Sequence, residues 1–157
     1  MNKNYLNEIL ALSEEFFHTA NDPFQIPLVK EAYDKIIDLY PGAIEYHIVN
    51  GEPVSWIIVI PTQRVVAEKF LDGELTEREL LENTRKEERY DALYLETAFT
   101  IPKYRRKGLA IPLFKKAVEH APLSDDALFF AWAYSPAGKA LLHKIEVVLG
   151  KALRIKE

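Results

Sequence analysis

Apolar residues recur at helical spacing through the first part of the chain. They predict one helix over residues 4 to 19 and a second helix over residues 27 to 40. Pro27 suits the first turn of the second helix, and Pro41-Gly42 ends it. The buried stripe of the first helix consists of Leu6, Ile9, Leu10, Phe16 and Phe17. Two amphipathic helices are therefore expected ahead of any sheet.

The period then changes to that of strands, because β-branched and aromatic residues dominate residues 43 to 49 and 53 to 60. Asn50-Gly51 lies between these runs, and this dipeptide is the strongest short signal for a hairpin. Residues 62 to 90 return to helical spacing and carry many charged side chains. Within them, Thr76-Glu77-Arg78-Glu79 is a capping-box pattern that predicts the start of a helix.

Strands and helices alternate in the rest of the chain. The pattern predicts a strand over residues 93 to 101, a helix over 108 to 120, a strand over 127 to 134, a helix over 136 to 149 and a short strand over 151 to 155. With no internal repeat or linker, this order indicates one mixed α/β domain over residues 1 to 157.

The composition narrows the possible chemistry. Apolar residues make up 48% of the chain, which is enough for a core, and the absence of cysteine excludes disulfides and a cysteine nucleophile. The four histidines are scattered and predict no metal site. The N-terminal residues lack a signal-peptide pattern, and the most apolar run, residues 56 to 60, is too short to cross a bilayer. We therefore expect a cytoplasmic protein with no membrane partner.

Positive charge is concentrated in one segment of a chain whose net charge is −4. The charged residues between 101 and 118 are all basic: Lys103, Arg105, Arg106, Lys107, Lys115 and Lys116. This asymmetry favours a local anionic ligand over a general affinity for nucleic acid, so no nucleic-acid partner is expected.

The same segment has the chemistry of a phosphate site. A loop joins the predicted strand to the predicted helix and reads Arg105, Arg106, Lys107, Gly108, Leu109 and Ala110. Gly108 lets the backbone approach a ligand closely, and free N–H groups at the start of a helix carry partial positive charge. Such a helix start binds phosphate groups.

This stretch resembles the GNAT superfamily of acyl-CoA N-acyltransferases. The family's signature is Gln or Arg, two residues, Gly, one residue, and Gly or Ala, and residues 105 to 110 satisfy it. Residues 100 to 104, Thr-Ile-Pro-Lys-Tyr, are also similar to the family's strand exit. The order of elements agrees with the family over most of the chain, whereas specific residue matches are confined to residues 93 to 118.

The resemblance implies a GNAT-like fold with a mixed, mostly antiparallel sheet flanked by helices. It also implies transfer of an acetyl group from acetyl-CoA to a primary amine by direct attack, without a metal. The loop amides of residues 105 to 110 would hold the CoA pyrophosphate. The strand end, here Ala98-Phe99-Thr100, would diverge from its neighbour and pair with the pantetheine arm, and a strand N–H would polarise the thioester carbonyl. Ser135 stands where the family has an Asn.

Strand alternation locates a candidate base. It places Tyr94, Glu96, Ala98 and Thr100 on one face, and Leu93, Leu95, Thr97 and Phe99 on the other. Glu96 is therefore predicted to accept the proton that an ammonium must lose before it attacks a thioester. The alternative is a buried structural carboxylate paired with an arginine. For the general acid, the family uses a Tyr in the last helix, which this chain lacks, so the candidates are His143, Tyr134 and solvent.

Residues 62 to 90 are a second departure from the family, whose third and fourth strands are joined by a short connection. This helical insertion is expected to cover the acceptor site and to shape its specificity.

Two other functions stay open: a non-catalytic acyl-CoA-binding module of the same fold, and a nucleic-acid-binding domain, against which the acidic remainder of the chain argues. The acceptor, a small cationic molecule or a lysine-bearing protein, also stays open, as do the acyl-chain preference and a homodimer.

Overall fold

A five-stranded sheet with the spatial order β1-β2-β3-β4-β5 forms the centre of the molecule. The computed structural model describes residues 5–17, 22–133 and 136–156. The strands are β1 (Ile44–Val49), β2 (Glu52–Thr62), β3 (Tyr90–Thr100), β4 (Leu123–Trp132) and β5 (Leu153–Lys156). Pairing is antiparallel from β1 to β3 and parallel from β3 to β5, so the predicted mixed α/β sheet is confirmed, with its pairings evenly divided.

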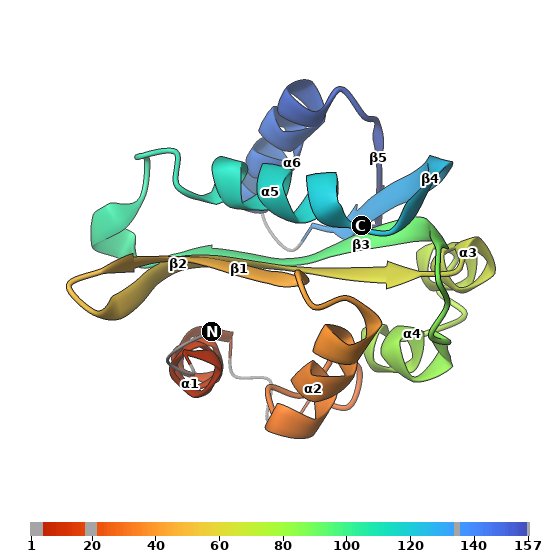
Figure 1. The fold of residues 1–157 in the computed structure, drawn as a ribbon, viewed down its shortest axis with the longest axis horizontal. Helices are drawn as coiled ribbons and strands as arrows, with labels where there is room; N and C mark the ends of the chain where they lie inside the picture. The colour runs from red at the N-terminus through yellow and green to blue at the C-terminus, as the bar shows by residue number, and fades with distance from the viewer. Residues whose placement is uncertain (1–4, 18–21, 134–135, 157) are drawn as a thin grey trace.

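Helices cover both faces of this sheet (Figure 1). They are α1 (Leu6–Phe17), α2 (Lys30–Leu39), α3 (Arg64–Leu71), α4 (Glu77–Asn83), α5 (Ala110–His120) and α6 (Pro136–Leu149), with a 3-10 turn η1 (Pro102–Tyr104) after β3. Figure 1 shows α1, α2 and α4 on one side of the sheet and α5 and α6 on the other. In the described ranges, no helix is both long enough and apolar enough to span a membrane.

Local sequence signals explain several of the element boundaries. Asn50 and Gly51 have φ angles of 52° and 78°, the left-handed pair that a tight hairpin between β1 and β2 requires. The capping box at the start of α4 is complete: the Glu79 amide donates to Thr76 Oγ1 and the Thr76 amide donates to Glu79 Oε1, each at 3.1 Å. Both predictions are confirmed, whereas β4 begins four residues earlier than expected.

The helices predicted for residues 62 to 90 are confirmed as α3 and α4, but the prediction that they join a third strand to a fourth is wrong. They connect the second and third strands of this sheet, β2 and β3. Phe70 of α3 packs against the sheet, with its ring centroid 5.2 Å from that of Tyr94 and 6.0 Å from that of Phe130. Tyr94 in turn stacks on Phe130 at 5.0 Å. This buried aromatic cluster anchors the insertion against the face that α1 and α2 also cover.

Candidate functional site

The parallel strands β3 and β4 pair over only part of their lengths. Their register runs from Tyr90 opposite Leu123 to Leu95 opposite Ala131. Beyond Leu95, β3 continues to Thr100 with partners on β2 alone among the described residues. In the described part of the chain, β3 and β4 therefore diverge after Leu95, which is the divergence near Ala98-Phe99-Thr100 that the GNAT resemblance led us to expect.

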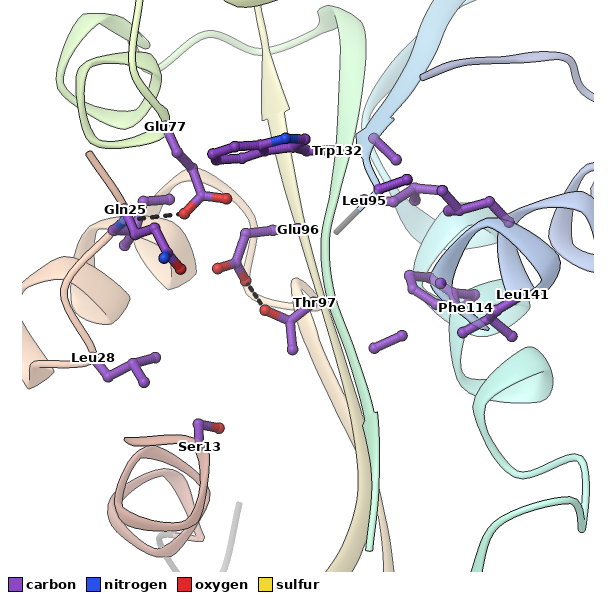
Figure 2. A pocket seen from close by; sticks show the side chains of 16 residues that line it. Ser13, Gln25, Leu28, Glu77, Leu95, Glu96, Thr97, Phe114, Trp132 and Leu141 are labelled. Atoms are coloured by element: carbon purple, nitrogen blue, oxygen red, sulfur yellow. Dashed lines mark hydrogen bonds between the residues drawn. The ribbon is translucent and has the colours of Figure 1, made fainter. Parts of the chain in front are cut away.

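A cavity of about 190 Å³ occupies this divergence. Side chains from both faces of the sheet line it (Figure 2). Ser13, Glu77 and Glu96 border it on the side of α1, α2 and α4, whereas Phe114 of α5 and Leu141 of α6 border it on the other side. The cavity thus joins a polar, acidic half to an apolar half through the gap between two strands.

Glu96 occupies a β-bulge in β3. Ile58 of β2 lies opposite Thr97 and Val59 lies opposite Leu95, so Glu96 has no opposite residue. The extra residue inverts the alternation: the Tyr94 hydroxyl contacts α4, yet Phe99 lies on the same face and contacts α1. The predicted faces are therefore wrong beyond Glu96, because one inserted residue shifts the period-2 pattern.

The bulge turns Glu96 and Thr97 into the same half of the cavity, as Figure 2 shows. The Thr97 hydroxyl donates a hydrogen bond to Glu96 Oε2. Burial, and next the charge of Glu77, raise the pKa of Glu96 to about 8, while the hydroxyls of Thr97 and Tyr33 act in the opposite direction. The arginine partner considered for Glu96 is not found in the described part of the chain. A carboxyl with this pKa exchanges protons near neutral pH.

Glu77 is a second acid of the cavity, and the sequence reasoning did not identify it. Its side chain is only 3% exposed, it accepts from the Tyr94 hydroxyl at 2.6 Å, and it accepts from the Ile26 amide at 3.0 Å. Burial raises the pKa of Glu77, and the two hydrogen bonds oppose that rise. The signal was present, because Glu77 precedes Leu80 and Leu81 by three and four residues and therefore lies on the inward stripe of α4.

The basic loop between η1 and α5 contains two residues with a left-handed backbone conformation. Arg106 has a φ of 64° and Gly108 a φ of 69°. A Cβ at Gly108 would meet no atom within 4 Å, so glycine is favoured there by conformation and the space above it is open. No side chain caps the start of α5 at Leu109, which leaves the first-turn amides of Ala110 and its neighbours available to a ligand.

The three basic side chains of this loop have different roles in the structure. Arg105 donates from Nε to the Thr100 carbonyl at 2.9 Å, and its guanidinium lies 5.6 Å from the centre of the Phe99 ring. Arg106 and Lys107 are exposed, and the Lys107 ammonium lies 5.6 Å from the centre of the Tyr104 ring. Arg105 thus fixes the end of β3, whereas Arg106 and Lys107 extend positive charge toward solvent.

A solved structure is similar to this chain. It is the crystal structure of an N-acetyltransferase from Staphylococcus aureus Mu50. The match spans 92% of this chain and 82% of the acetyltransferase chain, with 18% sequence identity and a TM-score of 0.44. No protein-family model matches the chain, and no curated protein matches its sequence. At this identity and TM-score, the likeness carries no inference about activity.

Among the remaining predicted site residues, the described structure places only His143, and it does not bring His143 to the cavity. His143 lies on α6 with a side chain that is 72% exposed, and its Nδ1 lies 3.1 Å from Glu146 Oε1. It is not among the residues that line the cavity. Tyr134 and Ser135 lie outside the described residues. In the ranges that the structure describes, no three metal-ligating side chains converge.

Proposed function

We propose that the protein is a GNAT-type N-acetyltransferase that transfers an acetyl group from acetyl-CoA to a primary amine. One observation carries this proposal: the cavity at the divergence of β3 and β4 contains a carboxyl group whose pKa is about 8. A base with that pKa suits the removal of a proton from an ammonium group.

The acyl donor is proposed to lie along the loop, α5 and the side of β3 that faces away from β2. The uncapped amides at the start of α5, with Arg106 and Lys107, suit a pyrophosphate. From this loop, α5 runs to the cavity, where Phe114 forms part of the wall. The backbone of Ala98-Phe99-Thr100 offers hydrogen-bonding groups to the amides of an extended ligand. The residues present therefore fit acetyl-CoA.

The amine is proposed to enter the half of the cavity that contains Glu96. As its ammonium proton passes to Glu96, the nitrogen attacks the thioester carbon. The new C–N bond forms, the C–S bond breaks and the nitrogen loses its second proton to solvent, while the departing thiolate takes a proton from solvent or from Tyr134. Acceptance of the ammonium proton by Glu96 is the step that the pKa of this carboxyl favours.

Thermal unfolding with saturating acetyl-CoA tests the donor site, with adenosine diphosphate as the control. A ligand at about 100 times its dissociation constant adds about 2.7 kcal/mol, which raises the midpoint of a chain this size by about 5 to 10 °C. Release of CoA with a panel of amines then tests turnover. No shift at millimolar acetyl-CoA would refute the proposal, whereas a shift without turnover would favour the non-catalytic acyl-CoA-binding module.

A further inference from the structure

The acceptor half of the cavity receives two carboxylates from two different elements. Glu96 comes from the bulge in β3, and Glu77 comes from the first turn of α4. Figure 2 shows the two carboxyl groups turned toward the same space, beside the ring of Trp132. The two hydrogen bonds to Glu77, from Tyr94 and Ile26, hold its carboxyl in this position.

No cationic side chain borders this cavity within the described ranges, since its lining residues include no lysine, arginine or histidine. Arg78 follows Glu77 on α4, but its guanidinium donates to the carbonyls of Gln25 at 3.2 Å and Asp22 at 3.1 Å. An acceptor that carried its own carboxylate or phosphate would meet like charges here, with no lining cation to compensate. An ammonium would meet two acids and the face of an indole ring, which attracts cations.

We infer that Glu77 determines acceptor specificity, and that the site takes primary alkyl ammonium compounds with an uncharged stem and rejects amines that carry an anionic group. This inference rests on the proposed acetyltransferase function for its catalytic readout. Ile26 and Leu28 give the same half of the cavity apolar wall, which suits a hydrocarbon stem.

The inference has a protonation consequence. Burial and the charge of Glu77 raise the pKa of Glu96 to about 8, so this acid of the pair holds a proton near neutral pH. The groups that act on the pair are Tyr33 of α2, Tyr94 and Thr97 of β3, and Asp22 of the segment before α2. When an ammonium binds, it stabilises both carboxylates, so the proton is released.

Butylamine and 4-aminobutyrate form a matched pair of probes. Both are four-carbon chains with an amine at one end, and the other end is a methyl group in butylamine and a carboxylate in 4-aminobutyrate. For the wild-type protein, we expect kcat/KM for butylamine to exceed that for 4-aminobutyrate at least about tenfold. Glu77→Gln should reduce this ratio about tenfold and leave the thermal shift by acetyl-CoA unchanged. The control, Glu82→Gln, changes an exposed acid of the same helix and should leave the ratio as it is.

Calorimetry in two buffers of different ionisation enthalpy provides a second test that needs no variant. Butylamine binding at about pH 7 should release about one proton from the wild-type protein. Equal acetylation of both probes would overturn the inference and leave the proposed function standing. Selective butylamine binding with proton release but no acetylation would support the acceptor site and refute the proposed function.

The lysine side chain is also an alkyl ammonium group. One further experiment therefore asks whether the acceptor is a small-molecule amine or a lysine of a peptide. Nα-acetyl-lysine methylamide is compared with butylamine under the same conditions. Faster acetylation of the lysine derivative would support the inference with a peptide as the source. Faster acetylation of butylamine would support it with a small molecule as the source. Failure of both amines in a protein that acetylates 4-aminobutyrate would overturn it.

Discussion

The chemistry of Glu96 depends on its position in the strand more than on its residue type. The bulge leaves it without an opposite residue on β2 and turns it into the cavity. Burial and the neighbouring Glu77 then raise its pKa to about 8, so the group carries a proton at neutral pH and loses it just above. In a regular stretch of β3, Thr97 would lie on the opposite face, so the bulge also brings the Thr97 hydroxyl to Glu96.

The pH dependence of activity follows from this pKa. In the proposed reaction, amine attack requires ionised Glu96, so we expect kcat/KM for the amine to rise with pH up to about 8 and then to level. Glu96→Gln should lower kcat by about 10²- to 10⁴-fold and remove this rise. Steady-state kinetics between about pH 6 and pH 9 measure both effects, with Glu82→Gln as the control. An unchanged pH profile in the Gln variant would exclude Glu96 as the base.

At the scale of elements, the loop and the first turn of α5 are proposed to act as one anion site. Arg105 fixes the loop to the end of β3 through the Thr100 carbonyl. Arg106 and Lys107 remain exposed beside the uncapped amides. The helix start therefore supplies the partial charge, and these two side chains supply full charges that salt can screen.

Charge reversal at one loop residue tests this arrangement. Arg106→Glu should weaken acetyl-CoA binding about tenfold or more at low salt, and the loss should shrink as salt increases. Lys69→Glu makes the same change at an exposed site at the end of α3 and should leave affinity unchanged. Calorimetric titration at two salt concentrations measures the effect. Equal losses in the two variants would indicate an effect of overall charge and exclude a local site.

The elements differ in how far the sequence alone predicts them. Asn50-Gly51 and the Thr76 capping box act over a few residues, so their turn and helix start could be predicted correctly. The bulge at Glu96 depends on the register with β2, and no local pattern in β3 encodes that register. Arg105 was expected to add charge to the anion-binding segment. Its hydrogen bond to the Thr100 carbonyl was not predicted, because that bond forms only when the loop folds back on the strand.

Of the two acids in the cavity, only Glu96 could be predicted, again because local patterns do not encode contacts between distant segments. The strand position of Glu96 could be read from the sequence, whereas the approach of Glu77 depends on how α4 packs against Tyr94 and the segment before α2. Helical periodicity shows that Glu77 faces inward, but it does not show what Glu77 meets there.

At the scale of the whole molecule, the two acids of the cavity couple stability to pH. Glu96 has a native pKa of about 8, raised from its ordinary value of 4.5, so the native state holds a proton that the unfolded chain has lost. The stabilising contribution of the protonated group is complete below about pH 4.5 and is lost as the pH rises toward about 8. Ionisation of Glu77, whose pKa is also raised, acts in the same direction.

Glu96→Gln removes this titration. Relative to the wild-type protein, the free energy of unfolding of the variant should increase by about 1 to 3 kcal/mol as the pH rises from about 5 to about 8. Above that pH, the difference should stay constant. Urea unfolding at several pH values measures it. Parallel curves for the two proteins would show that Glu96 ionises freely in the native state.

The contacts proposed for the acyl donor and the acid Glu77 come from different segments of the chain. The contacts proposed for the acyl donor come from β3 and α5, whereas Glu77 comes from the segment between β2 and β3, whose ends lie side by side in the sheet. That segment can be exchanged as a cassette while the donor contacts keep their sequence. Under the proposed function, acceptor preference could thus diversify through one interchangeable stretch, in evolution or in the laboratory, without rebuilding the rest of the protein.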